Sequence, residues 1–141
     1  MIHCAAETGI QKSRNELWRI NVEGTRHVVQ QAGQAQKLER FTYISTAYVA
    51  GTQRGLVKED APLPTHFFSL YEQSKAEAER VVRATSLPLT ICRPGMIVGN
   101  SQTGRTRNFN TVYSVLKLMR FNRRSSPVRE PSRANRGGSR R

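Results

Sequence analysis

The sequence predicts an α/β chain that contains part of a doubly wound parallel sheet. Short apolar segments alternate with amphipathic ones in the order strand, helix, strand, helix, strand. Each helical connection is long enough to return the chain to the same end of the sheet, as parallel pairing requires. This alternation is typical of doubly wound folds. With 141 residues, the chain is long enough for one domain with a core.

The first predicted strand spans residues 1–6, a short apolar run that ends in two alanines. A strand that is buried on both faces has this continuous apolar character. A helix is predicted from about Asn15, because apolar and small residues then recur at three- and four-residue spacings along one stripe. Asn21 falls on this inward stripe. A satisfied buried amide and a functional amide are both open interpretations of it.

The second predicted strand is the aromatic and β-branched run of residues 41–46. It ends in the hydroxyls of Ser45 and Thr46, at the end of the sheet where open α/β folds place their ligand crevice. Ordinary strand-end hydroxyls are the alternative interpretation. A polar loop with an acidic pair and two prolines follows at residues 52–68.

A second helix is predicted to begin after Ser69 and to end near Ala84. Ser69 and Glu72 have the spacing of a capping box, in which the hydroxyl and the carboxylate each satisfy a backbone amide. Tyr71 and Lys75 lie four residues apart and so share one helix face. A cation about 4–6 Å from a phenol lowers the pKa of the phenol, which can then exchange a proton with a carbonyl or alcohol oxygen near neutral pH. A half-buried tyrosine beside a surface lysine is the alternative.

A third strand is predicted over residues 87–93, and a Pro-Gly pair ends it. A short amphipathic stretch compatible with a helix follows at residues 110–121. From residue 122 to residue 141, Arg, Ser, Pro, Asn and Gly dominate. Such a segment buries too little to offset the roughly 1–2 kcal/mol per residue of ordering entropy. We therefore expect a sheet domain over residues 1–121 and a disordered Arg-rich tail over residues 122–141.

The positive charge is concentrated near the C-terminal end. The net charge is +13, and residues 105–141 contribute +10 of it, with eleven Lys or Arg against the single Glu130. The first 104 residues carry twelve basic and nine acidic groups. The basic pI therefore does not identify the domain as nucleic-acid binding. Contact of the tail with nucleic acid or an acidic membrane is the non-enzymatic alternative, although few aromatic residues are present to stack on bases.

The composition gives little support to a metal site or a membrane segment. Cys4 and Cys92 are far apart, without a Cys-x-x-Cys motif or clustered histidines, so we expect neither a zinc site nor a disulfide framework. The first residues lack the basic flank and apolar run of a signal peptide. No apolar stretch approaches the roughly 18 residues of a membrane span. We expect a cytoplasmic chain without a metal.

Five short segments carry a family resemblance. They are Ile2-His3-Cys4-Ala5-Ala6, Asn21-Val22-Glu23-Gly24-Thr25, Tyr43-Ile44-Ser45-Thr46-Ala47, Tyr71-Glu72-Gln73-Ser74-Lys75 and Arg93-Pro94-Gly95. In this order they resemble the motifs of the extended short-chain dehydrogenases/reductases, the group that contains nucleotide-sugar epimerases and dehydratases. The run Ser-Thr-Ala-Tyr and the phrase Tyr-Glu-Gln-Ser-Lys-Ala-Glu are most similar to the branch of fatty acyl-CoA reductases and thioester reductase domains, the male sterility branch. The resemblance covers about residues 2–121.

The resemblance implies a Rossmann-like fold and hydride transfer between NAD or NADP and the carbonyl carbon of a small molecule. It implies that Tyr71 exchanges the proton on oxygen. It also implies that Lys75 lowers the pKa of this phenol and bonds the nicotinamide ribose. Thr46 takes the place of the residue that polarises the substrate oxygen, with Ser45 as a weaker neighbour. Asn21 matches a helix asparagine that supports the site or a proton-relay water.

The resemblance also implies residues that contact the cofactor. Ala5 and Ala6 would line it, and Pro94 and Gly95 would pass beside the nicotinamide. A thioester or aldehyde is the expected substrate. A nucleotide-sugar epimerase or dehydratase, which uses the same Tyr, Lys and Thr, is the alternative.

The sequence departs from the family in its phosphate-binding part. The loop Gly-x-x-Gly-x-x-Gly after the first strand is absent, since Gly95, Gly99 and Gly104 lack that spacing and follow a different strand. A pyrophosphate needs those close backbone amides and the helix N-terminus behind them. The residue that selects NAD or NADP is also missing. We therefore expect a domain truncated at both ends, without its first βαβ units, that binds dinucleotide weakly or not at all and has little activity alone.

Overall fold

The structure, a computed structural model, describes residues 1–9, 11–106 and 112–125. The chain divides into two compact units, the first comprising Met1–Ile97 and the second beginning at Val98. This division lies earlier than the boundary expected after residue 121. Every predicted site residue belongs to the first unit.

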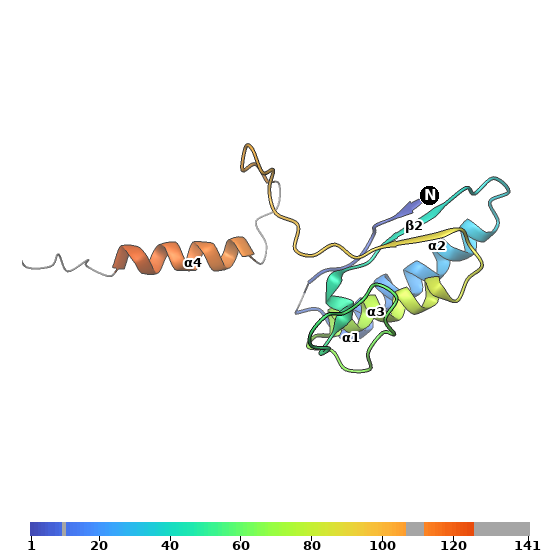
Figure 1. Cartoon of the computed structure of the whole chain (residues 1–141), viewed down its shortest axis with the longest axis horizontal. Helices are drawn as coiled ribbons and strands as arrows, with labels where there is room; N and C mark the ends of the chain where they lie inside the picture. Colours follow the sequence, from blue (N-terminus) through green and yellow to red (C-terminus); the bar gives the residue numbers. More distant parts are fainter. Residues whose placement is uncertain (10, 107–111, 126–141) are drawn as a thin grey trace, which may run out of the picture. The chain divides into compact units, whose positions relative to one another are not determined.

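The first unit is built on a three-stranded parallel sheet in the order β1 (Ile2–His3), β2 (Phe41–Ile44), β3 (Leu89–Cys92). The register pairs Ile2 with Thr42, and Thr42 with Thr90. Parallel strands joined by helices confirm the predicted fold class (Figure 1). The strands are shorter than the predicted ranges 1–6, 41–46 and 87–93, because the residues that follow each strand leave the ladder. The carboxyl ends of all three strands lie at one edge of the sheet.

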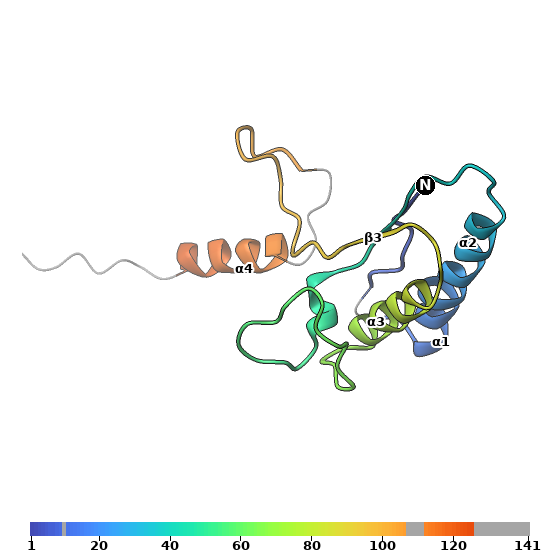
Figure 2. The ribbon, with the colours of Figure 1, turned by 45° about the vertical axis from the view of Figure 1, so that its right-hand side comes forward.

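Helices cover one face of this sheet (Figures 1 and 2). One helical run consists of α1 (Arg14–Leu17), the π-helical segment η1 (Trp18–Glu23) and α2 (Gly24–Gly33). The Oγ of Ser13 caps it by accepting a hydrogen bond of 3.3 Å from the backbone N–H of Glu16. The second helix is α3 (Leu70–Arg83). Both helices were predicted, but the sequence pattern did not predict the π-helical segment.

The core lies between β2 and these helices. Alternation along the strand directs Phe41 and Tyr43 toward the helices and leaves Thr42 and Ile44 half-buried on the other face. The core cluster consists of Val29, Ala32, Phe41, Tyr43, Ala78 and Val82. Ile2 and Cys92 are exposed on the face that these helices do not cover. Tyr43 thus brings a hydroxyl into an otherwise apolar layer.

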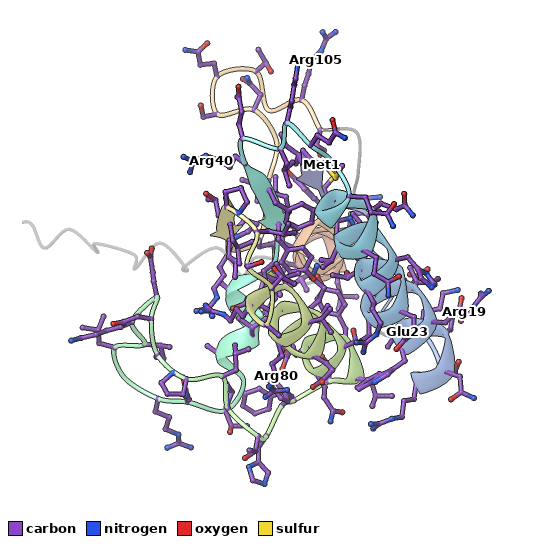
Figure 3. All side chains as sticks on the ribbon, turned by 90° about the vertical axis from the view of Figure 1, so that its right-hand side faces the viewer. Met1, Arg19, Glu23, Arg40, Arg80 and Arg105 are labelled. Atoms are coloured by element: carbon purple, nitrogen blue, oxygen red, sulfur yellow. The ribbon has the colours of Figure 1, made fainter. Side chains whose placement is uncertain are left out.

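Three contacts fix the start and the outer side of α3. The Oγ of Ser69 accepts the N–H of Glu72 at 3.2 Å, as the capping box predicts. The Glu72 carboxylate accepts the N–H of Phe68 at 2.9 Å, one residue before the cap. Further along α3, Arg80 donates to the carbonyl of Pro64 at 2.9 Å and ties the 52–68 loop to the helix (Figure 3). Tyr71 therefore lies in the first turn of α3.

A buried carboxylate holds α3 to the ends of two strands. Glu79 has no exposed side-chain surface and accepts hydrogen bonds from the Ser45 hydroxyl at 2.8 Å and from Arg83 at 2.9 Å. Two nitrogens of Arg93 also donate to it, one to each carboxylate oxygen. Burial alone would raise the pKa of Glu79. The hydrogen bonds from Arg93, Ser45 and Arg83 outweigh this effect, so its pKa is lowered.

The second unit contains α4 (Val112–Ser125), and the hydroxyl of Tyr113 accepts the N–H of Gly99 at 2.6 Å. The helix extends four residues beyond 121, so residues 122–125 are helical where disorder was expected. The rest of the predicted tail, residues 126–141, lies outside the described residues. Among the helices in the described ranges, none is long and apolar enough to cross a membrane.

Replacing the buried carboxylate should destabilise the first unit. In Glu79→Gln the shape is kept, but Arg93 and Arg83 lose their counter-charge, so we expect a loss of roughly 3 kcal/mol in the free energy of unfolding by urea. Glu77→Gln on the same helix is the matched control. Glu77 pairs with Arg80 at the surface, and its removal should cost at most about 0.5 kcal/mol. Equal losses in the two variants would contradict a structural role for Glu79.

Acid should weaken the fold through the same group. The pKa of Glu79 is lowered in the folded state, so its contribution is present above the ordinary value of 4.5 and is lost as the pH falls through the folded-state pKa. The free energy of unfolding, measured from pH 7 to about pH 3, should therefore fall less steeply in Glu79→Gln than in the wild type. Parallel curves for the two proteins would contradict the lowered pKa.

Candidate active site

The candidate site lies where β2 ends beside the first turns of α3. The strand continues through Thr46 into the 3-10 helix η2 (Ala47–Ala50). The Oγ1 of Thr46 accepts the N–H of Tyr48 at 3.3 Å and so caps this helix. The N–H of Ala47 donates to the carbonyl of Pro94 at 2.9 Å, which ties the end of β2 to the segment after β3. These bonds hold the Thr46 hydroxyl in a defined place.

Tyr71 and Thr46 bring two hydroxyls together at this point. Tyr71 is half-buried and Thr46 is buried. Burial raises the pKa of Tyr71, a side-chain hydrogen bond with Thr46 opposes the increase, and Tyr48 adds to it. The pKa of the phenol is therefore raised overall. At neutral pH Tyr71 is protonated and can donate its proton.

The ammonium of Lys75 is bound to β2. Its Nζ donates to the hydroxyl of Tyr43 and to the carbonyl of Ile44, each at 2.9 Å, and lies 4.5 Å from the centroid of the Tyr43 ring. Lys75 is only 3% exposed. Burial lowers the pKa of Lys75 to about 8, while the charge of Glu79 acts in the opposite direction.

The pKa of Tyr71 does not show the predicted effect of Lys75. We expected the ammonium to lower the pKa of the phenol, but the pKa of Tyr71 is raised and Lys75 is not among its causes. The four-residue spacing does place both residues near the same strand end. The long lysine side chain, however, extends to acceptors on β2, while burial desolvates the phenol. Helix spacing alone does not determine where such a side chain ends.

Asn21 supports the site from the π-helical segment. Its Oδ1 accepts the backbone N–H of Glu7 at 2.8 Å, and its Nδ2 donates to the carbonyl of Glu7 at 3.0 Å and to the hydroxyl of Ser74 at 2.9 Å. Asn21 is 1% exposed. Both amide hydrogens are therefore used within the protein, and Asn21 joins the loop after β1 to α3. Of the interpretations left open by the sequence, the geometry gives a satisfied buried amide that supports the site.

Ser45 does not join the two hydroxyls. Its side chain is buried and donates to Glu79, on the side of α3 that faces the end of β3. We had expected it to contact a cofactor, and the structure instead places it in the carboxylate cluster. Because side chains alternate along an extended strand, Ser45 and Thr46 point in different directions.

The other residues expected to contact a cofactor follow the ends of the outer strands. Ala5 is exposed and Ala6 half-buried after β1, and Pro94 is half-buried after β3. Gly95 is exposed, and a Cβ added there would meet no atom within 4 Å. There is thus open space beside Gly95 at the end of β3.

No role was predicted from the sequence for Tyr43 or Glu79. Glu79 lies four residues after Lys75, so the helix spacing that paired Tyr71 with Lys75 could have added it to the same face. Tyr43 lies in β2 two residues before Ser45, on the inward side of the strand. An aromatic hydroxyl at an inward position requires a partner. This requirement could have predicted from the sequence that the Tyr43 hydroxyl has a polar partner, which in the structure is Lys75.

The described residues offer a hydrogen-bond donor on Lys75 and open space at Gly95, which suit the nicotinamide half of a dinucleotide but not its pyrophosphate. Lys75 has a third N–H beyond its two acceptors, and the space beside Gly95 can admit a planar group. The sequence lacks the glycine-rich loop that would hold the pyrophosphate. Within the described ranges, no group of three or more His, Cys, Asp or Glu side chains is arranged to hold a metal ion.

Comparison with known proteins identifies relatives over most of the chain. A family model of NAD-binding domains, described as male sterility protein, matches residues 1–134. A ketoreductase of Stigmatella aurantiaca, acting on 4-hydroxy-2-methyl-3-oxo-4-farnesyl-3,4-dihydroquinoline-1-oxide, is 34% identical over 108 residues, which are 73% of this chain and 32% of the relative. The isonitrile lipopeptide synthase of Streptomyces coeruleorubidus is 33% identical over 124 residues, 83% of this chain and 8% of the synthase. The chain thus spans about a third or less of these relatives.

Solved structures show the same fold. The terminal R domain from the myxalamid PKS-NRPS biosynthetic pathway is 32% identical with a TM-score of 0.75, over 82% of this chain and 31% of that domain. The UDP-glucuronic acid 4-epimerase of Bacillus cereus, in complex with UDP-glucuronic acid and NAD, is 25% identical with a TM-score of 0.56, over 65% of this chain and 32% of the epimerase. Both agree with the Rossmann-like fold implied by the five motifs.

The match over residues 1–134 and the shared fold give the same assignment as the ordered motifs. The chain belongs to the male sterility protein family of NAD-binding domains, within the extended short-chain dehydrogenases/reductases.

Proposed function

We propose that this chain carries the proton-transfer site of an NAD(P)-dependent reductase that acts on a thioester or aldehyde. The observation that carries the proposal is the pair of hydroxyls from Thr46 and Tyr71 at the end of β2, with the buried Lys75 beside them. In this function Tyr71 is the general acid that protonates the carbonyl oxygen of the substrate. Thr46 donates a hydrogen bond to the same oxygen.

The electrostatics of the site support the direction of reduction. A carbonyl that accepts a hydride needs a proton on its oxygen, and Tyr71 is protonated at neutral pH because its pKa is raised. Thr46 accepts the N–H of Tyr48, which leaves its own hydroxyl hydrogen as a donor. Oxidation of an alcohol would instead require a base at this position. The protonated phenol therefore favours a reductase.

NADH or NADPH supplies the hydride when it is bound. Lys75 would hold the nicotinamide ribose through its remaining N–H, and Ala5, Ala6, Pro94 and Gly95 would line the nicotinamide. Asn21 and the Glu79 cluster keep the loop after β1, α3 and the strand ends in place around these residues. Because the glycine-rich loop is absent from the sequence, we propose that the chain alone binds the dinucleotide weakly.

The choice of a thioester or aldehyde is supported by the family match and by the likeness to the terminal R domain at 32% identity. The epimerase of Bacillus cereus is less similar, at 25% identity. An epimerase or dehydratase acting on a nucleotide-sugar is therefore the alternative. We also propose a cytoplasmic location, which agrees with the free, exposed thiols of Cys4 and Cys92.

Loss of the phenol should abolish turnover. The test uses a chimera in which residues 1–106 replace the matching segment of the myxalamid R domain, which supplies the regions that this chain does not span. In the chimera, Tyr71→Phe should lower kcat for NADPH-dependent reduction of an acyl-CoA or aldehyde by about 100-fold or more, because the general acid is gone. Circular dichroism and NADPH fluorescence should show that the fold and cofactor binding remain.

Two outcomes would contradict the proposal. One is an unchanged kcat in Tyr71→Phe, which would exclude the phenol as the proton donor. The other is turnover of a UDP-sugar, with no reduction of an acyl-CoA or aldehyde, by the chimera with the wild-type segment. The second outcome would favour the epimerase alternative.

A further inference from the structure

Tyr43 lies beneath the candidate site and has no role in the proposed chemistry. It is 1% exposed and belongs to the core cluster between β2 and the helices. Its hydroxyl is nevertheless a partner of Lys75, at 2.9 Å from Nζ, and its ring lies 4.5 Å from the same nitrogen. A buried phenol can contact an ammonium in both ways, through its oxygen and through its ring.

The position of the ammonium is defined by two successive residues of one strand. Nζ donates to the Tyr43 hydroxyl and to the Ile44 carbonyl, and both acceptors are carried by β2. An ammonium has three N–H donors. Two of them are held by β2, and the third is left for a group outside the strand. Movement of the ammonium away from β2 would break both bonds.

The charged neighbours of Lys75 do not replace these contacts. Glu79 on α3 attracts the ammonium at longer range, but its oxygens accept from Ser45, Arg83 and Arg93. The remaining titratable neighbours are His3 on β1 and Tyr71 on α3. Burial lowers the pKa of His3, and the nearby charge of Lys75 lowers it further. Neutral oxygen acceptors, rather than an ion pair, therefore hold this buried cation.

Thr25 lies near the Tyr43 hydroxyl. Burial raises the pKa of Tyr43 far above its ordinary value, so the phenol stays protonated, and the hydroxyl of Thr25 lies near enough to oppose this shift. The Thr25 hydroxyl donates to the carbonyl of Asn21 at 2.6 Å. The Nε2 of His3 lies 3.0 Å from the same threonine oxygen and acts as the donor, since the hydroxyl hydrogen of Thr25 is already used. Thr25 thus connects the surroundings of the Tyr43 hydroxyl to His3 and to the π-helical segment.

We propose that Tyr43 is a positioning residue that, together with the Ile44 carbonyl, fixes the ammonium of Lys75 so that one N–H remains for a ligand. Only the identity of that ligand, a cofactor ribose, rests on the proposed function. The positioning itself is a property of the protein without any ligand. It links β2 and α3 at the site through one hydroxyl.

The test is the pKa of Lys75 in the full 141-residue chain without cofactor. Carbon-13-labelled lysine is titrated by NMR, and the Lys75 resonance is identified by its loss in Lys75→Met. In the wild type it should titrate at about 8. In Tyr43→Phe the charged form loses an acceptor, so the pKa should fall by about one unit. Tyr48→Phe makes the same chemical change outside this contact and should leave the pKa of Lys75 unchanged.

A second variant provides the test if Tyr43→Phe does not fold. Thr25→Val keeps the Tyr43 ring and removes the neighbouring hydroxyl together with its bonds to His3 and to the Asn21 carbonyl, so the pKa of Lys75 should fall by a smaller amount. An unchanged pKa in folded Tyr43→Phe would overturn the proposal. If that variant does not fold, an unchanged pKa in Thr25→Val would overturn it. The titrations need neither cofactor nor substrate, so their result does not depend on the reductase assay. The positioning role of Tyr43 and the proposed function can therefore be refuted independently.

Discussion

The site depends on a buried lysine ammonium that is bound to the end of a β-strand. Removing such a charge from water is unfavourable, and the chain offsets this through the Tyr43 hydroxyl and the Ile44 carbonyl. The cost remains visible in the pKa of Lys75, which burial lowers to about 8. The contact also joins α3 to β2, because the lysine belongs to the helix and its acceptors to the strand. This one interaction therefore determines where the Lys75 ammonium lies and stabilises its charge.

Neighbouring polar groups are divided into two sets by this arrangement. On one side, Glu79 is bound by Ser45 and two arginines and serves the fold. On the other, Thr46 and Tyr71 keep hydroxyls at the edge of the sheet. The buried carboxylate attracts Lys75 without bonding it. The ammonium can thus keep one N–H for a ligand, and the phenol stays protonated. Both features are the ones that the proposed reductase function uses.

Much of the fold could be predicted from the sequence, because it follows from local patterns. Apolar runs and helical stripes identified the strands and helices, and Ser69 predicted the start of α3. The site was predicted less well. The helix spacing correctly placed Tyr71 and Lys75 on one face. However, the position of the lysine ammonium is determined by acceptors on β2, which the spacing does not encode. The predicted lowering of the Tyr71 pKa by Lys75 is therefore not seen. The buried roles of Tyr43 and Glu79, and the π-helical turn that carries Asn21, arise from packing between distant segments, which spacing does not encode.

A double-mutant cycle between Tyr43 and Lys75 tests this arrangement most directly. The free energy of unfolding is measured at pH 7 for the wild type, Tyr43→Phe, Lys75→Met and the double variant. If the hydroxyl holds the ammonium, the two substitutions are coupled by about 1–3 kcal/mol. Additive effects, within about 0.5 kcal/mol, would show that the two side chains do not interact and would contradict the structure of the site proposed above.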